Sequence, residues 1–160
     1  MKIGVISDTH ISQPNHALPK KIFEIFKDVD LILHAGDLTD KTVIDQLETI
    51  APVEVVRGNM DSYQIPYPIK KTLQLEEIRL GLIHGYGSPT DIRKRIAKEF
   101  DKDINIIVYG HSHAPDNEYD GNILFFNPGS PTDKRYAPYH SVGIIELLSN
   151  QKINSHIVKL

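Results

Sequence analysis

The chain has 160 residues, with eight histidines and no cysteine, which suits one domain with its own core. The lack of cysteine excludes disulfides, Cys-type zinc sites, iron–sulfur clusters and thiol nucleophiles, so any metal site must use nitrogen and oxygen ligands. A formal net charge of −3, from 18 basic and 21 acidic residues, does not indicate a protein that binds nucleic acid stably.

Apolar runs alternate with amphipathic stretches at the start of the chain. The pattern predicts strands over 2–7, 30–34 and 53–56, and helices over 19–29 and 41–50. This alternation is typical of a parallel sheet with crossover helices. The sequence has no run approaching the roughly 20 apolar residues of a membrane span. The first apolar run is also too short for a signal peptide, so we expect a cytoplasmic protein with no membrane association.

The rest of the chain has a mixed pattern. It predicts one helix over 89–100 and further strands over 71–76, 78–83, 104–109, 122–126, 142–148 and 153–158. Nine strands are too many for one small open sheet. We therefore expect an α/β fold, a four-layer sandwich in which two mixed β-sheets pack face to face with helices outside, and a single domain over residues 1–160.

Metal-competent side chains follow five of the predicted strands. In chain order they are Asp8 and His10, Asp37, Asn59, His84, and His111 and His113. Ligands of α/β sheets bind at the carboxyl ends of strands, so we expect these side chains to converge. The first and last groups are pairs of residues two positions apart. If the backbone there is extended, both members of a pair point the same way.

Seven donors are too many for one tetrahedral ion. They suit two divalent ions about 3.5–4 Å apart with one bridging carboxylate, for which Asp37 is the natural choice. Carboxylate, imidazole and amide ligands favour Mn²⁺, Fe²⁺, Zn²⁺, Ni²⁺ or Co²⁺ over Mg²⁺ or Ca²⁺. Among these we expect Mn²⁺ first.

The order of the short motifs resembles that of the calcineurin-like metallophosphoesterases. The motifs are Asp8-Thr9-His10, Gly36-Asp37, Gly58-Asn59-Met60-Asp61, His84-Gly85, Gly110-His111-Ser112-His113 and Asn127-Pro128-Gly129-Ser130. The resemblance is closest to the small bacterial and archaeal phosphodiesterase branch that includes the retromer scaffold subunit. It implies the metallophosphoesterase fold and a phosphodiesterase in which a hydroxide bridging two metal ions attacks phosphorus.

The resemblance also implies a role for each donor. Asp8, His10, Asp37 and His113 would surround one metal ion, and Asp37, Asn59, His84 and His111 the other. Asp61 and His34 are expected to support these ligands without binding metal themselves. The expected partner is a small phosphate-ester substrate.

One position departs from the family pattern. Many members carry a histidine directly after the Gly-Asn pair, where it helps to protonate the leaving group, and this chain has Met60. A thioether cannot donate a proton, so no catalytic side chain is predicted beyond the metal-bound hydroxide. A missing general acid costs about 10²–10⁴ in rate, which favours activated aryl phosphodiesters as substrates. Because of Met60, a second function remains an alternative, namely a metal-binding scaffold for protein interactions with little catalysis. A phosphomonoesterase on the same site is a further alternative.

The remaining candidates are weaker. His16, His140 and His156 are expected on the surface. Arg57 and Arg135 are candidates for contacting a substrate phosphate, although solvated arginine is commoner. The Tyr- and Pro-rich stretch 63–68 either lines a substrate pocket or forms a homo-oligomer contact.

Overall fold

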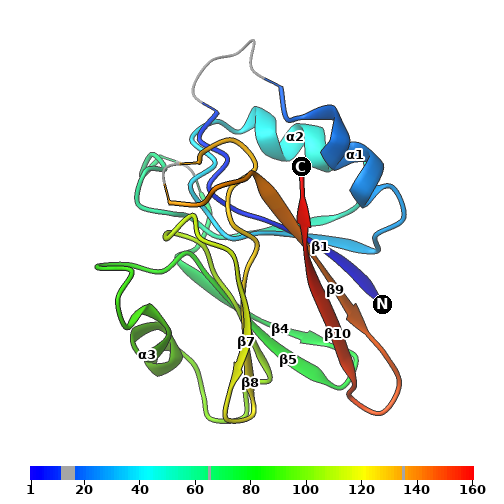
Figure 1. The fold of residues 1–160 in the computed structure, drawn as a ribbon, viewed down its shortest axis with the longest axis vertical. Helices are drawn as coiled ribbons and strands as arrows, with labels where there is room; N and C mark the ends of the chain where they lie inside the picture. The colour runs from blue at the N-terminus through cyan, green and yellow to red at the C-terminus, as the bar shows by residue number, and fades with distance from the viewer. Residues whose placement is uncertain (12–16, 65, 135) are drawn as a thin grey trace.

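The computed structural model describes residues 1–11, 17–64, 66–134 and 136–160, and it confirms the predicted α/β architecture of two mixed sheets (Figure 1). His16 and Arg135 lie outside the described residues, so the expectations for them are not addressed. None of the helices in the described ranges is long and apolar enough to cross a membrane.

The first sheet has the strand order β10-β9-β1-β2-β3. Its strands are β1 (Lys2–Ile6), β2 (Leu31–His34), β3 (Val53–Val55), β9 (Ser141–Leu147) and β10 (Ile153–Lys159). β1, β2 and β3 are parallel, whereas β9 runs antiparallel to both β1 and β10. The crossover helices that the sequence predicts connect β1 to β2 and β2 to β3.

The second sheet has the strand order β4-β5-β6-β8-β7. Its strands are β4 (Lys70–Leu75), β5 (Ile78–Ile83), β6 (Ile106–Val108), β7 (Asp116–Asp120) and β8 (Ile123–Asn127). β5, β6 and β8 are parallel, and the edge strands β4 and β7 are antiparallel to their neighbours. The sequence did not predict β7, because its residues are acidic and largely exposed and carry no apolar alternation.

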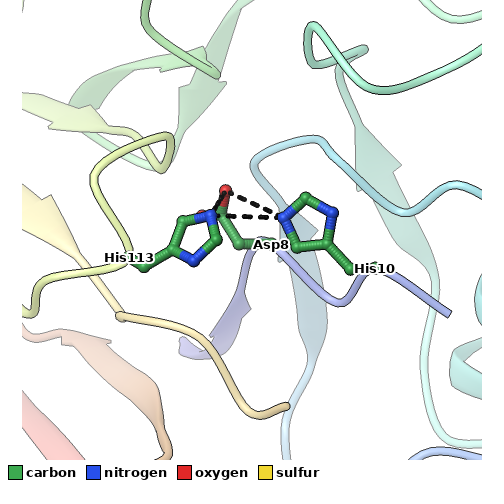
Figure 2. A group of neighbouring side chains, drawn as sticks. All are labelled: Asp8, His10 and His113. Atoms are coloured by element: carbon green, nitrogen blue, oxygen red, sulfur yellow. Dashed lines mark hydrogen bonds and ion pairs between the residues drawn. The ribbon is translucent and has the colours of Figure 1, made fainter. Parts of the chain in front are cut away.

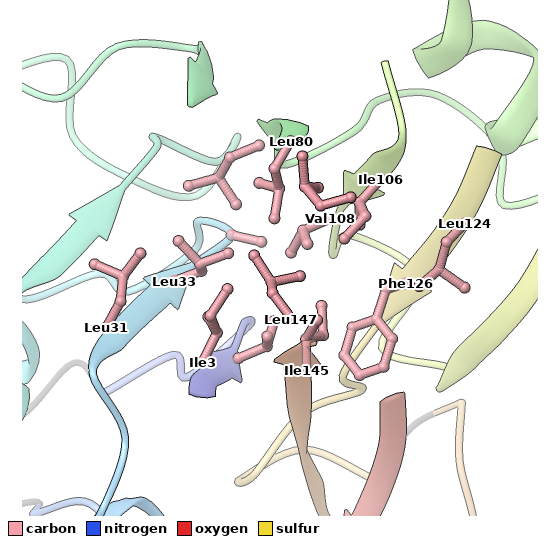
Figure 3. Close-up of a cluster of buried hydrophobic side chains, with 14 of the residues drawn as sticks. Ile3, Leu31, Leu33, Leu80, Ile106, Val108, Leu124, Phe126, Ile145 and Leu147 are labelled. Carbon is pink, nitrogen blue, oxygen red and sulfur yellow. The ribbon is translucent and has the colours of Figure 1, made fainter. Parts of the chain in front are cut away.

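The main core lies between the two sheets (Figure 3). Ile3, Leu33 and Ile145 from the first sheet meet Leu80 and Phe126 from the second. Alternate side chains of each strand point into this layer, as the period of two in a strand requires. The sheets are therefore held face to face by a continuous apolar layer.

Helices cover the outer faces of both sheets (Figure 1). α1 (Lys20–Phe26) and α2 (Thr42–Leu47) pack on the first sheet through residues such as Phe26 and Leu47. α3 (Ile92–Ile96) continues into a 3-10 turn and packs Ile92 and Ile96 on the second sheet. All three helices are shorter than the predicted ranges, because the flanking residues form turns rather than regular helix.

Candidate metal centre

The seven predicted donors meet at one edge of the sandwich. They come from the loops after β1, β2, β3, β5 and β6, which are five of the six strands that pair in parallel within their own sheet. Four of the donors are buried, namely Asp8, Asp37, His84 and His113, and His10 and His111 are half-buried. Asn59 is exposed, so the site opens to solvent on that side.

Asp8, His10 and His113 form a first group, and their side chains point toward one another, the first two from the loop after β1 and the third from the loop after β6 (Figure 2). Nε2 of His10 lies 3.2 Å from Nε2 of His113. Oδ1 of Asp8 lies 3.3 Å from Nε2 of His113 and 3.9 Å from Nε2 of His10. Ligand atoms bound at about 2.1 Å to one ion lie about 3.0–3.4 Å apart, so the two distances to His113 suit a shared cation, whereas Asp8 and His10 lie somewhat farther apart.

A second group surrounds His84. Its Nε2 lies 3.2 Å from Oδ2 of Asp37 and 3.1 Å from Oδ1 of Asn59. Oδ1 of Asn59 in turn lies 2.9 Å from Nδ1 of His111. The four remaining donors thus gather around a second point, next to the first.

The tautomer of His84 shows that this second group requires a positive charge. Its Nδ1 lies 2.8 Å from the carbonyl oxygen of Ala35, which can only accept, so Nδ1 carries the proton. In a neutral imidazole, Nε2 is then a lone pair that faces the oxygens of Asp37 and Asn59. Lone pairs that converge in this way need either a proton or a metal ion between them.

The titration behaviour of His84 and Asp37 agrees with this reading. Burial opposes the charged imidazole, but the hydrogen bond to Asp37 and the charges of Asp8 and Asp37 raise the pKa of His84 above its usual value. Burial also acts to raise the pKa of the Asp37 carboxyl, yet the hydrogen bond and charge of His84 lower it. The pocket favours a carboxylate next to a cation, and a divalent ion would satisfy both groups.

Hydrogen bonds from the protein hold both buried carboxylates so that one oxygen of each faces the other donors. Oδ2 of Asp8 accepts from the Ser7 hydroxyl at 2.7 Å, the N–H of His111 donates to both carboxylate oxygens, and Oδ1 also faces three histidines. Oδ1 of Asp37 accepts from the Met60 N–H at 2.7 Å. Its Oδ2 lies 3.8 Å from Nε2 of His10 and 3.2 Å from Nε2 of His84. A single oxygen of Asp37 therefore lies between the two groups, as does Oδ1 of Asp8.

The backbone that aims these donors is not extended, which corrects the reason given for the paired motifs. Asp8, His10, Asp37, His111 and His113 all have positive φ angles, between 44° and 66°. Left-handed residues turn the chain sharply, so convergence comes from these turns and not from the alternation of a strand. Such conformations cost about 1–3 kcal/mol each and persist only where the surroundings enforce them.

Two glycines leave room for the carboxylates. A Cβ atom on Gly58 would lie 2.7 Å from Cγ of Asp37, and one on Gly110 would lie 2.6 Å from Oδ2 of Asp8. Real Cβ atoms essentially never approach so closely. These positions of the Gly-Asn and Gly-His motifs thus need glycine because the backbone passes against a ligand.

Asp61 and His34 lie behind the donors. Oδ2 of Asp61 accepts from the N–H groups of Asp37 and Gly58, and Oδ1 accepts from the N–H of Thr39. His34 accepts from the N–H of Gly36 at Nδ1, and its Nε2 lies 3.1 Å from the Thr9 hydroxyl. Because burial lowers the pKa of His34 to about 3, this imidazole is neutral at ordinary pH.

Further supporting residues were missed from the sequence. Oδ2 of Asp133 lies 3.3 Å from Nδ1 of His113, on the side of the ring away from the other donors. The Ser130 hydroxyl donates to the carbonyl oxygen of Asp8, and the Thr132 hydroxyl donates to that of Thr9. The Asn-Pro-Gly-Ser motif pointed to Ser130, but no pattern distinguished Asp133 from other loop acids.

Met60 lies at the open side of the centre. Its side chain is 60% exposed, and its backbone N–H, not its thioether, contacts Asp37. Arg57 is half-buried and lines a cavity that adjoins Asn59 and His84. His140 is half-buried and His156 exposed, and neither has a described contact with the seven donors.

The site and fold have counterparts in known proteins. A family model described as the calcineurin-like phosphoesterase superfamily domain matches residues 1–150. A probable metallophosphoesterase of Methanothermobacter thermautotrophicus is 40% identical over 163 residues, covering 99% of this chain and 92% of that protein. A probable metallophosphoesterase of Methanocaldococcus jannaschii is 37% identical over 163 residues, covering 100% and 82%.

Two solved structures share the fold. One, described as a novel archaeal phosphodiesterase, is 23% identical with a TM-score of 0.77 and covers 99% of this chain and 100% of its own. Vacuolar protein sorting 29 from Cryptosporidium parvum is 22% identical with a TM-score of 0.76, covering 99% and 97%. At these identities the likeness shows the architecture alone.

Proposed function

Because the chain belongs to the calcineurin-like phosphoesterase superfamily, we propose that it is a phosphodiesterase with a dinuclear metal centre. The observation that carries the proposal is the convergence of seven donors in two adjacent groups that share carboxylate oxygens. Likeness to a structure described as an archaeal phosphodiesterase supports the diester class. We further propose that residues 1–160 act as one domain in the cytoplasm.

The two groups would hold two divalent ions. Asp8, His10, Asp37 and His113 are proposed as ligands of one ion, and Asp37, Asn59, His84 and His111 as ligands of the other. The oxygen- and nitrogen-rich donor set favours Mn²⁺, with Fe²⁺, Zn²⁺, Ni²⁺ and Co²⁺ as alternatives. When bound, such an ion pair activates a water molecule and neutralises the oxygens of a phosphate ester.

The protein supplies orientation. Hydrogen bonds from the Ser7 hydroxyl and the Met60 N–H fix the rotation of the Asp8 and Asp37 carboxylates, so that one oxygen of each faces the site. The Ala35 carbonyl fixes the tautomer of His84, and Asp133 lies against Nδ1 of His113. Preorganised ligands of this kind hold an ion without reorganising when substrate arrives.

Proton delivery to the leaving group is the weak point of the site. The exposed Met60 thioether cannot donate a proton at the place where many family members have histidine. We therefore propose that the enzyme acts best on diesters whose leaving group departs as a stable anion, such as p-nitrophenolate.

The proposal is tested by hydrolysis of bis(p-nitrophenyl) phosphate with added Mn²⁺. Asp37→Asn and His111→Ala should each lose about two orders of magnitude or more in rate, because each alters a proposed ligand. Asp120→Asn and His156→Ala change the same residue types at exposed positions outside the site and should match wild type. Equal rates in all five proteins would refute the site assignment.

A second candidate is a metal-binding interaction scaffold with little catalysis. Met60 and the architectural likeness to vacuolar protein sorting 29 favour it. Metal analysis showing two bound equivalents, together with no turnover of diesters or of p-nitrophenyl phosphate, would support the scaffold. Faster turnover of p-nitrophenyl phosphate than of the diester would instead indicate a phosphomonoesterase.

A further inference from the structure

A cavity of about 340 Å³ adjoins the candidate metal centre. Asn59 and His84, two of the proposed ligands, form part of its wall, and Arg57, Tyr63 and Tyr86 line the remainder together with other residues. Its volume falls within the range of about 300–1,000 Å³ that small-molecule sites occupy. The cavity is therefore continuous with the place where a phosphate would bind.

Tyr63 presents an aromatic ring beside this cavity. The residue is 90% exposed, and the guanidinium carbon of Arg57 lies 4.9 Å from the centre of the ring. Stacking of a guanidinium on an aromatic face is attractive and limits the motion of both groups. A large exposed ring held in this way next to a cavity is a ready surface for another planar group.

Tyr86 presents a second ring, and its hydroxyl is fixed by Glu99, which also lines the cavity. Its hydroxyl donates to Oε1 of Glu99 at 2.9 Å, and Oε2 of the same carboxylate pairs with Nζ of Lys70 at 3.0 Å. The hydroxyl is thus engaged, and what Tyr86 offers a ligand is its ring, which is 46% exposed. Ile69, 62% exposed, adds apolar surface to the same cavity.

We propose that this cavity is the subsite for a planar aromatic group carried on one arm of the phosphodiester. The inference rests on the proposed function, because the phosphate must lie at the metal centre for its ester arm to enter the cavity. A ring that stacks on Tyr63 or Tyr86 replaces water at exposed aromatic faces, whereas a small alkyl arm leaves those faces uncovered. Nucleosides and simple aryl groups share this chemistry.

The test measures ring binding separately from catalysis. Isothermal titration of the Mn²⁺-supplemented protein compares adenosine 5′-monophosphate with ribose 5-phosphate, which has the same phosphate and sugar but no base. One stacked ring corresponds to about a fivefold to hundredfold gain in affinity, so the nucleotide should bind tighter by that factor. Phenyl phosphate distinguishes a nucleoside arm from a simple aryl arm. If it binds as tightly as the nucleotide, the cavity accepts simple aryl groups; if it binds more weakly, the cavity prefers nucleosides.

Variants locate the effect. Tyr63→Ala should remove most of the preference for the nucleotide, and Tyr63→Phe should retain it because the ring is kept. Tyr119→Ala removes another exposed tyrosine, which lies on β7 and does not line the cavity, and should behave as wild type.

The proposal is overturned if wild type binds the nucleotide and ribose 5-phosphate equally or binds neither. It is also overturned if Tyr63→Ala weakens both ligands to the same extent. A protein that prefers the nucleotide but hydrolyses no phosphodiester would retain the subsite and lose the proposed phosphodiesterase activity, so the two failures are distinguishable.

Discussion

Asp61→Ala should both destabilise the protein and weaken metal binding. The Asp61 carboxylate is 6% exposed and accepts from the N–H groups of Asp37, Gly58 and Thr39. The first two of these hydrogen bonds are buried. Removing a charged acceptor costs about 1.5–3 kcal/mol for each buried donor left unpaired, so we expect a loss of about 3–6 kcal/mol. That is a large share of the roughly 5–15 kcal/mol by which domains are stable.

Asp61→Asn should lose less, because one amide oxygen can still accept from two N–H groups while the NH₂ group meets the third. Urea unfolding of the metal-free proteins measures the free energy of unfolding without a contribution from a bound ion. Competition with a chelator then measures metal affinity, which should fall about 10–100-fold because the loops carrying Asp37 and Asn59 lose their common anchor. Asp120→Ala, at an exposed aspartate, is the control. A loss below about 1 kcal/mol with unchanged metal affinity would refute the reasoning.

Three further changes probe other parts of the centre. Burial lowers the pKa of His34 from 6.5 to about 3, so the unfolded chain binds a proton that the folded chain does not. Stability should therefore fall by about 1.4 kcal/mol per pH unit as pH decreases from about 6.5 toward 3. The urea midpoint of His34→Gln should fall less steeply with decreasing pH than that of wild type. Equal slopes in the two proteins would show that His34 does not cause this loss of stability. Met60→His restores a proton donor and should raise kcat on alkyl phosphodiesters about tenfold or more, with a smaller gain on p-nitrophenyl esters. An equal gain on both would exclude a general-acid role. Asp133→Asn should weaken metal binding about 10–100-fold by loosening His113, as judged by chelator competition, while leaving unfolding of the metal-free protein nearly unchanged. Unaltered metal affinity would show that the contact does not orient the ring.

The parts of the fold that the sequence predicts well are those whose apolar pattern is local. β1, β2 and β5 are nearly continuous apolar runs because both faces of the strand are covered. β7 (Asp116–Asp120) is the opposite case. It is an edge strand held by backbone hydrogen bonds to β8; Glu118 and Asp120 are exposed and Asp116 pairs with Arg93, so its residues carry no apolar alternation and give no strand signal.

The candidate site likewise has residues that the sequence predicts and features that it does not. The seven donors could be identified because each follows a strand and belongs to a short motif. The turns that aim them could not be predicted, because left-handed φ angles at non-glycine residues such as Asp8 and His113 are enforced by tertiary packing. Asp133 was missed for a related reason. Its role depends on a contact with His113, which a loop acid does not reveal from its own neighbours in the chain.

The position of β1 in its sheet has a consequence for biosynthesis. β1 lies between β2 and β9, and Lys2 pairs with Glu146, so one side of β1 stays unpaired until the 144 residues that follow Lys2 up to Glu146 (146 − 2) have been synthesised. At about 5–20 residues per second, that delay is roughly 7–29 s on the ribosome. Throughout it, an apolar strand edge is open to pairing with other chains. Chaperone protection of the nascent chain should therefore matter until β9 has been synthesised and pairs with β1.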